Sequence, residues 1–185
     1  MIKKSLIIAS LLFATTSTMA ENTFVGIDLG KSKLTASSGG ASSTSESSFS
    51  IKGGKEFSDH RIYGKHLTVN TTGAKLVSLT AHYDKYLSTG KTKPFIGASI
   101  GYMQYAWNED FGGDKLDMSG LAYGINLGIL IESTKQLSFE FGYEHMLTLA
   151  NDTACTTTTN GVCTEKSNIN MDKYNNLRIG LNYKF

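Results

Sequence analysis

The side chains best suited to acid–base chemistry are the four histidines, His60, His66, His82 and His145. His145 directly follows Glu144 where apolar and polar residues alternate, so this pair is the one place where we would look for a catalytic base. Neighbouring residues of a β-strand point to opposite faces, so the two side chains cannot form a dyad directly. We therefore predict that the protein is not an enzyme and holds no cofactor or metal.

The first twenty residues have the pattern of a secretory signal peptide. Lys3 and Lys4 precede an apolar run at 6–14, and Thr18-Met19-Ala20 ends in small residues. The run is shorter than the about 20 apolar residues of a transmembrane helix. We expect cleavage after Ala20, a signal peptide at 1–20 and one domain at 21–185. Without Lys3 and Lys4 the net charge falls from +2 to zero, which argues against a nucleic-acid partner.

Cys155 and Cys163 are the only cysteines, and both lie in a polar stretch at 151–171. Two thiols with no further ligand beside them are too few for a metal site. The export route is oxidising, so we predict a disulfide that closes the segment between them and stiffens this loop.

The element that would organise the fold is the last one, at 172–185. Leu177, Ile179, Leu181, Tyr183 and Phe185 alternate with Arg178, Gly180, Asn182 and Lys184. This period of two predicts a β-strand with one apolar face. Aromatic residues at its end favour a strand that closes a membrane barrel and carries apolar groups into lipid.

The same alternation recurs along the chain and predicts eight strands. One begins at Phe24, one begins at Leu137, and the others cover 48–57, 60–70, 76–87, 94–106, 120–132 and 172–185. Short turns at 58–59, 89–93 and 133–136 alternate with polar loops at 37–47, 108–119 and 151–171, and with a turn of intermediate length at 70–75. This pattern predicts an all-β fold, an eight-stranded antiparallel up-and-down transmembrane β-barrel.

The face opposite the apolar set decides which side is inside. A soluble barrel or sandwich would bury its apolar face, but here the other face carries glycines and charges, which suit a narrow interior surrounded by lipid. The predicted interior charges include Asp28, Lys52, Glu140, Glu144 and Arg178. If the last two strands pair with residue numbers summing near 322, Glu144 faces Arg178 and the two could plug the barrel.

Two motifs resemble those of bacterial outer-membrane β-barrels. The Tyr183-x-Phe185 ending is similar to their terminal insertion signal, and the strand from Pro94 to Tyr102 resembles those of the small OmpA-like and opacity-type barrels. The resemblance implies a location in the bacterial outer membrane, reached through the periplasm. It also implies contacts with outer-membrane lipid and lipopolysaccharide, and insertion by the barrel-assembly machinery.

Three functions remain open from the sequence. The leading one is a structural or adhesin-like role, in which the loops at 37–47, 108–119 and 151–171 contact a host or surface ligand. The second is a narrow channel for ions or small solutes, which would depend on Glu140, Glu144 and Arg178. The third is a lipid-modifying outer-membrane enzyme.

Aromatic belts are expected at the two interfaces, with Tyr83, Phe139, Tyr183 and Phe185 at one and Trp107, Tyr123 and Tyr174 at the other.

Overall fold

The computed structural model describes residues 22–37, 41–71, 74–107, 117–159 and 162–185. Within these ranges, the side chains of 36, 37, 41, 42, 71, 74, 107, 117, 152–159 and 162–169 are not described. The predicted signal peptide lies outside the described residues. Within them, no helix is long and apolar enough to cross a bilayer.

Eight antiparallel strands form a closed barrel in which each strand pairs with its neighbours in sequence and β1 also pairs with β8. The predicted fold class is confirmed. The strands are β1 (Thr23–Ser37), β2 (Ala41–Glu56), β3 (His60–Thr71), β4 (Ala74–Tyr86), β5 (Thr92–Trp107), β6 (Asp117–Glu132), β7 (Leu137–Thr159) and β8 (Val162–Lys184).

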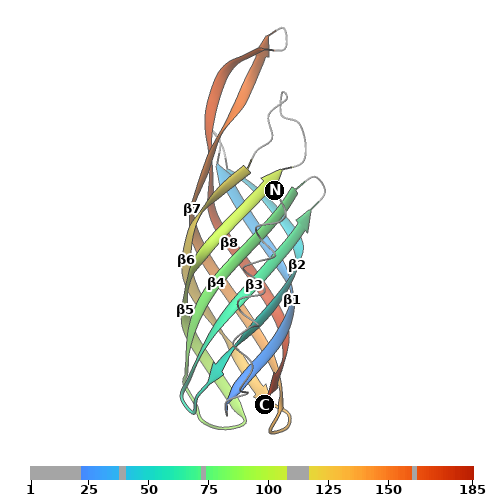
Figure 1. Cartoon of the computed structure of the whole chain (residues 1–185), viewed down its shortest axis with the longest axis vertical. Coiled ribbons are helices and arrows are strands. Elements are labelled where there is room, and N and C mark those ends of the chain that lie inside the picture. Colours follow the sequence, from blue (N-terminus) through green and yellow to red (C-terminus); the bar gives the residue numbers. More distant parts are fainter. Residues whose placement is uncertain (1–21, 38–40, 72–73, 108–116, 160–161) are drawn as a thin grey trace.

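The two ends of the barrel differ in how the strands are connected (Figure 1). The turns after β2, β4 and β6 lie at one end together with the C-terminus, and we call this the turn end. The β1–β2, β3–β4, β5–β6 and β7–β8 connections lie at the other end, which we call the hairpin end. The segment at 60–70, which has the least regular alternation, is a full strand of the barrel.

Two of the predicted loops are largely strand. Residues 41–47 belong to β2, and most of 151–171 belongs to β7 and β8. The prediction was wrong there because it used apolar alternation as the signal. Antiparallel pairing is a backbone interaction, so the serine-rich segment at 41–47 and the threonine-containing segment at 151–171 can form it without an apolar face.

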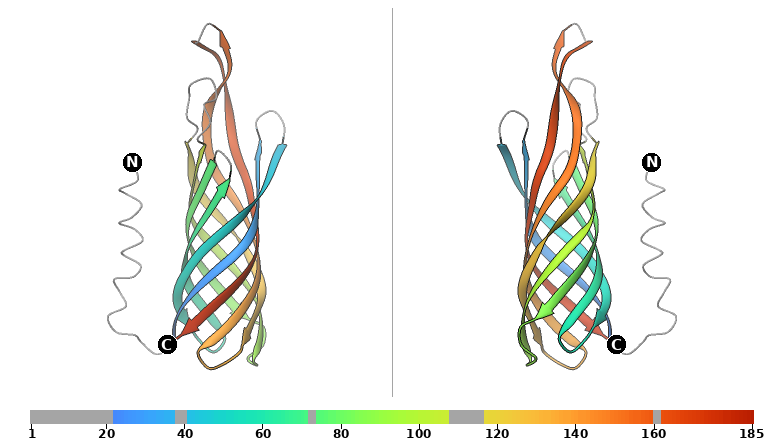
Figure 2. Two further views of the ribbon diagram at one scale, coloured as in Figure 1. Left: turned by 90° about the vertical axis from the view of Figure 1, so that its right-hand side faces the viewer. Right: turned by 90° about the vertical axis from the view of Figure 1, so that its left-hand side faces the viewer.

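The β7–β8 hairpin reaches farther than the others (Figure 2). β6 pairs with β7 up to Asn151, and β1 pairs with β8 up to Asn170. In the described backbone beyond these residues, β7 and β8 pair with each other. They form a two-stranded ribbon, residues 152–159 and 162–169, that projects from the hairpin end (Figures 1 and 2).

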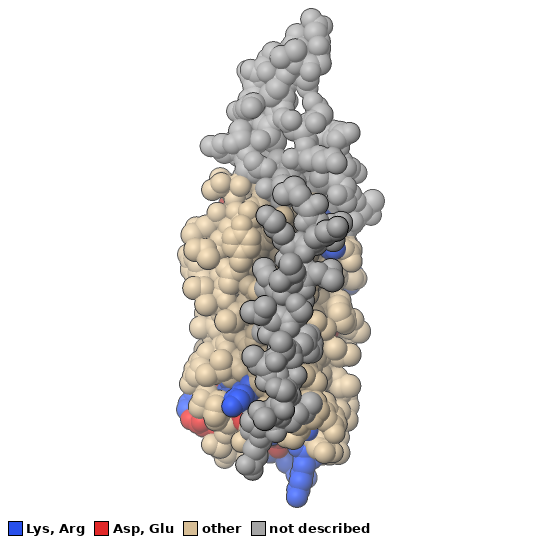
Figure 3. Space-filling model, in the orientation of Figure 1, with Lys and Arg blue, Asp and Glu red and all other residues tan. Residues whose placement is uncertain are grey.

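The outer wall carries a continuous apolar belt. Its side chains are exposed although they are large and apolar; Leu177 is 65% exposed and Ile100 61%. On the face in Figure 3, the described charged side chains gather at the turn end, and the band above them consists almost entirely of other residue types. An apolar surface of this extent is unfavourable in water and favourable against acyl chains. The belt includes Ile27, Leu29, Phe49, Ile62, Ile96, Ile100, Leu121, Ile125, Leu127, Ile129, Phe139, Phe141, Leu177, Ile179 and Leu181.

A charge placed in the belt tests this assignment. Ile125 is 55% exposed in the outward row of β6, and we expect Ile125→Arg to lower the free energy of unfolding in lipid vesicles by about 2–4 kcal/mol. Equilibrium denaturant titration of the vesicle-inserted protein measures this. Ser45→Arg, at an exposed site of β2 toward the hairpin end, is the matched control. Equal stability losses for the two variants would contradict the position of the belt.

Candidate functional site

The interior of the barrel is filled by three layers of side chains. Charged groups occupy its middle, an aromatic and ionic layer lies toward the turn end, and an apolar layer lies toward the hairpin end. The charged layer, called the central charge cluster below, consists of Asp28, Lys52, Arg61, Lys65, Asp84, Glu140, Glu144 and Arg178. The inward charges named from the sequence, Asp28, Lys52, Glu140, Glu144 and Arg178, all lie in it.

Glu140 on β7 is the residue that links most of this cluster. Its Oε2 atom accepts hydrogen bonds from Lys52 Nζ at 2.7 Å and from Arg61 Nη1 at 2.8 Å. Its Oε1 atom accepts one from Arg178 Nη2 at 3.0 Å. Three cations from β2, β3 and β8 therefore converge on one fully buried carboxylate, and long side chains bridge strands that are not neighbours in the sheet.

The remaining members complete the network. Arg61 donates to Asp84 Oδ2 from Nε at 2.8 Å and from Nη2 at 2.6 Å. Lys52 Nζ lies 2.7 Å from Asp28 Oδ1, and Lys65 pairs with Glu144. Four cations thus face four carboxylates, so the cluster has no net charge. Such balance matters because an unpaired charge in a dry interior is strongly unfavourable.

The predicted register between the last two strands was wrong by two residues. Arg178 lies opposite Gly142, and Glu144 lies opposite Asn176. The Arg178 guanidinium still reaches Glu144, with Nη1 3.7 Å from Oε2, but its closer partner is Glu140. Alternation determines which face a residue occupies; hydrogen-bond pairing around the closed barrel decides which residue it opposes.

Glycines on the inner face make room for these long side chains. A Cβ on Gly180 would lie 2.1 Å from Asp28 Oδ1, and one on Gly97 would lie 2.2 Å from Asp84 Oδ1. A Cβ on Gly142 would lie 3.0 Å from Arg178 Cζ. The inward-facing glycines therefore provide the space that the inward-facing charged side chains occupy.

An aromatic layer lies below the cluster at the turn end. The Arg61 guanidinium carbon lies 4.7 Å from the ring centre of Phe95, 4.9 Å from that of Tyr63 and 5.9 Å from that of Phe24. These cation–π contacts stabilise the buried guanidinium in addition to its ion pairs with Asp84 and Glu140.

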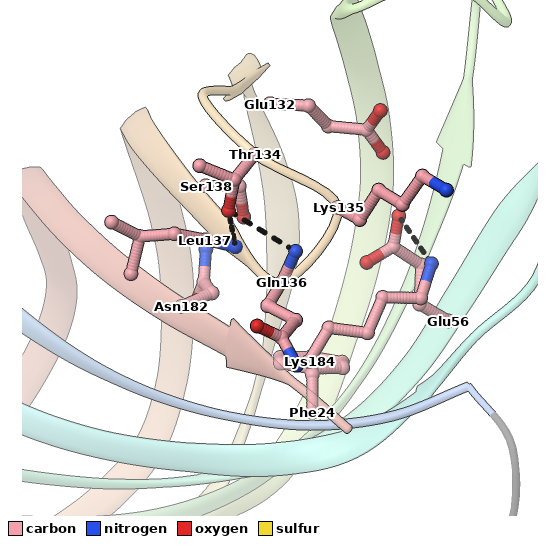
Figure 4. A pocket seen from close by; sticks show the side chains of 10 residues that line it. All are labelled: Phe24, Glu56, Glu132, Thr134, Lys135, Gln136, Leu137, Ser138, Asn182 and Lys184. Carbon is pink, nitrogen blue, oxygen red and sulfur yellow. Dashed lines mark hydrogen bonds and ion pairs between the residues drawn. The ribbon is translucent and has the colours of Figure 1, made fainter.

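Beyond this aromatic layer, an ionic group borders a small pocket at the mouth of the barrel (Figure 4). Lys93 Nζ lies 3.1 Å from Glu56 Oε1 and also pairs with Glu132. Lys184 Nζ lies 3.9 Å from the same Glu56 oxygen. Lys135 also lines the pocket, so three lysines accompany two glutamates at this mouth of the barrel.

The apolar layer toward the hairpin end was not predicted. Four methionines, Met103, Met118, Met146 and Met171, are each at most 2% exposed and pack with Leu67 and its neighbours. The signal was present, because Met103 and Met146 share the inward parity of Ser99 and Glu144 on their strands. The layer also contains Leu34, Val69, Leu76, Ala122, Ala150 and Tyr174.

His82, rather than His145, is the histidine near Glu144. His82 Nε2 lies 3.6 Å from Glu144 Oε1, and the His82 ring stacks on Tyr63 at 4.6 Å. His145 lies on the outer wall, where its Nδ1 is 2.6 Å from Asn175 Oδ1. As predicted, Glu144 and His145 lie on opposite faces of the strand.

The stretch Gly97-Ala98-Ser99-Ile100-Gly101 has the spacing of the G-x-S-x-G nucleophile motif, a match missed from the sequence. Ser99 lies opposite the inward-facing His82 on β4. However, the motif lies in the middle of β5 and not at a strand-to-helix turn, and both side chains are at most 5% exposed. A substrate has no access to them.

Among the described residues, no group of three or more His, Cys, Asp or Glu is placed to hold a metal ion.

The predicted disulfide lies outside the described side chains. The backbone register places Cys155 opposite Lys166 and Cys163 opposite Thr158, all within the β7–β8 ribbon. The disulfide remains a prediction.

The aromatic belts correspond only in part to the expectation. Tyr83, Phe139, Tyr183 and Phe185 toward the turn end, and Tyr123 toward the hairpin end, are all exposed on the wall. Tyr183 and Phe185 form an edge-to-face pair at 5.1 Å. The placement of Tyr174 in a belt was wrong, because it is fully buried in the apolar layer, with Oη 3.1 Å from Ser32 Oγ. The Trp107 side chain lies outside the described set.

A stacked group strengthens the interface at the turn end. The His60 ring lies between those of Phe57, at 4.5 Å, and Tyr83, at 5.5 Å. Asp59 in the β2–β3 turn accepts hydrogen bonds from Lys85 and from His60 Nδ1. These two bonds, that from Lys85 first, lower the pKa of Asp59 to about 2.

Solved structures similar to this one include small outer-membrane barrels. Neisserial surface protein A has a TM-score of 0.67 and 20% identity, over 89% of this chain and 98% of that one. Outer membrane protein H of Pseudomonas aeruginosa has a TM-score of 0.56 and 25% identity, over 89% and 99%. The outer membrane protein OprG of the same organism has a TM-score of 0.61 and 15% identity, over 89% and 96%. No family model and no curated protein sequence matches the chain.

The closed eight-stranded barrel, its exposed apolar belt and these likenesses define the class. The chain is a small eight-stranded β-barrel protein of the bacterial outer membrane.

The role of Glu140 gives the first prediction for this site. Glu140→Gln leaves Lys52, Arg61 and Arg178 with excess positive charge, and we expect a loss of about 3–5 kcal/mol in the free energy of unfolding. The double variant Lys52→Met/Glu140→Gln restores the balance and is expected to recover part of that loss. Denaturant titration in lipid vesicles measures both. Glu132→Gln, at the partly exposed mouth, is the control, and a loss as large there would argue against a special role for Glu140.

The glycine packing gives the second prediction. Gly180→Ala places a methyl group against the Asp28 carboxylate, and we expect a loss of about 1–3 kcal/mol. Gly53→Ala is the matched control, because its nearest neighbour atom would lie at an ordinary 3.5 Å. The heat-dependent gel shift of the folded barrel reports the midpoint of unfolding. Indistinguishable midpoints for the two variants would contradict the packing argument.

Proposed function

We propose that the protein is a plugged, non-conducting outer-membrane barrel that acts as a structural scaffold and presents its hairpins at the cell surface. In bacterial barrels the short turns face the periplasm and the long connections face outward. Applied here, this orientation places the hairpin end and the β7–β8 ribbon outside the cell.

The observation that carries the proposal is the filled interior. The central charge cluster joins opposite walls through Glu140, and the apolar layer lies between it and the hairpin end. An ion passing through would have to break balanced buried ion pairs and then cross a layer of mainly apolar side chains. Eight-stranded barrels have interiors of a size that side chains can fill.

The surface role is supported by the buried interior and by the polar side chains of the projecting ribbon. Ser99 and His82 are buried in the interior, so we look to the exterior for interaction with a ligand. The β7–β8 ribbon extends beyond the barrel wall and contains many hydroxyl side chains, which suit polar contacts with a host or surface ligand. A structural or adhesin-like role fits this arrangement, and an enzymatic role has no support from the placement of Ser99 and His82.

Single-channel recording in a planar bilayer tests the proposal. The refolded protein, with folding confirmed by its heat-dependent gel shift, is expected to show no discrete conductance steps. Discrete steps that change in amplitude in Glu144→Gln or Arg178→Gln would contradict the proposal. They would instead establish the second function, a narrow channel through the central charge cluster. Asp172→Asn, an exposed acid outside the interior, is the control for nonspecific effects of charge.

A further inference from the structure

The apolar layer toward the hairpin end differs between the two halves of the barrel. On β1, β3 and β4 its described members are aliphatic, namely Leu34, Leu67, Val69 and Leu76. On β5, β6, β7 and β8 its described members are methionines, alanines and one tyrosine. Branched and aromatic side chains are the ones enriched in strands, so strand preference alone does not account for the methionine-rich half.

Every methionine after the predicted signal peptide lies in this half of the layer. The chain has six methionines, of which Met1 and Met19 precede the expected cleavage site. The other four lie one on each strand from β5 to β8, and each is at most 2% exposed. The name thioether cluster is used below for Met103, Met118, Met146 and Met171.

Small residues lie beside the thioether cluster and give its side chains room. In the strand register, three of the four methionines are opposite a glycine or an alanine: Met103 with Gly120, Met146 with Gly124, and Met171 with Ala150. Methionine is unbranched, has three rotatable side-chain bonds and adapts to irregular space. Beside partners this small, the thioether sulfurs can change position and turn toward a common point while the strands stay in place.

Glu144 supplies a negative charge next to the cluster. It precedes Met146 by two residues on β7, and both side chains are buried on the inward face of that strand. The Glu144 Oε1 atom has no hydrogen-bond partner among the described residues. The described members of the apolar layer include no carboxylate. Neutral sulfur ligands with a single carboxylate nearby suit a cation that carries one positive charge.

We propose that the thioether cluster binds a soft monovalent metal ion of the Cu(I) and Ag(I) kind. Thioether and thiolate sulfurs are soft ligands that select Cu(I), whereas carboxylates, carbonyls and water select magnesium, calcium and manganese. Four thioethers from four consecutive strands supply sulfur donors for one such ion without any charged ligand in the layer.

The expectation that the protein holds no metal was drawn from cysteine and histidine side chains, and thioethers are a different class of ligand. The cluster lies on the hairpin side of the central charge cluster, so an ion from that end reaches it without crossing the buried ion pairs. Metal binding therefore goes beyond the proposed function, and the metal titration and the conductance experiment can fail separately.

The test uses the full mature chain, labelled with methyl-13C methionine, refolded in phosphatidylcholine bicelles and titrated with Ag(I). Cys155→Ser and Cys163→Ser are included because thiolates would compete for the ion. The mature chain has four methionines, so its spectrum reports each member of the thioether cluster separately. We expect all four methyl signals to shift together and to saturate at one Ag(I) per chain. Zn(II) is expected to leave them unchanged.

Leucine variants test whether the sulfurs are the ligands. Leucine is close to methionine in volume, so Met103→Leu/Met146→Leu and Met118→Leu/Met171→Leu are expected to fold, as the heat-dependent gel shift reports. We expect each double variant to bind Ag(I) roughly tenfold or more weakly, because each removes two soft ligands. The control Leu67→Ile/Leu76→Ile alters packing in the same layer without removing sulfur, and is expected to bind like the unaltered protein.

Four results would each overturn the proposal. Methyl signals that shift without saturating would indicate nonspecific contact with silver. Unchanged affinity in both leucine variants would show that the thioethers are not the ligands. Equal loss in the isoleucine control would assign the effect to packing, and equal shifts with Zn(II) would contradict selection by soft sulfur.

Discussion

Closure of eight strands in lipid is the constraint on which the rest of this structure depends. Backbone groups inside a bilayer must find partners within the protein, and β1 does so by pairing with both β2 and β8. A ring of only eight strands has a narrow interior, so every second side chain along each strand must fit against residues from the opposite wall. The contents of the interior follow from this shortage of space.

The interior meets the constraint in two different ways along its length. In the middle, long charged side chains span the barrel, glycines such as Gly180 and Gly97 give them room, and Glu140 is shared by three cations. Equal numbers of cations and carboxylates keep the cluster neutral, which limits the cost of removing charges from water. Toward the hairpin end, methionines and branched aliphatic residues fill most of the space, and the Tyr174 hydroxyl among them is paired with Ser32.

The exterior is not uniform around the barrel. β7 and β8 form the projecting ribbon, and exposed lysines lie on the wall near its base, Lys31 and Lys33 on β1 and Lys173 on β8. The side of the barrel that carries the longest hairpin therefore also carries polar side chains at the edge of the belt.

Alternation along the chain was sufficient to predict eight strands, their inner and outer faces and the inward position of Asp28, Lys52, Glu140, Glu144 and Arg178, because strand geometry repeats every two residues. It did not predict that the ribbon is strand, because backbone pairing needs no apolar pattern. It also did not predict the apolar layer, because inward-facing methionines look like ordinary strand residues. The partner of Arg178 was decided by tertiary structure, because the register of a closed barrel is set by all eight pairings together. For the same reason, only the folded chain brings Lys31 and Lys33 on β1 beside Lys173 on β8, residues from opposite ends of the sequence that become neighbours when the barrel closes.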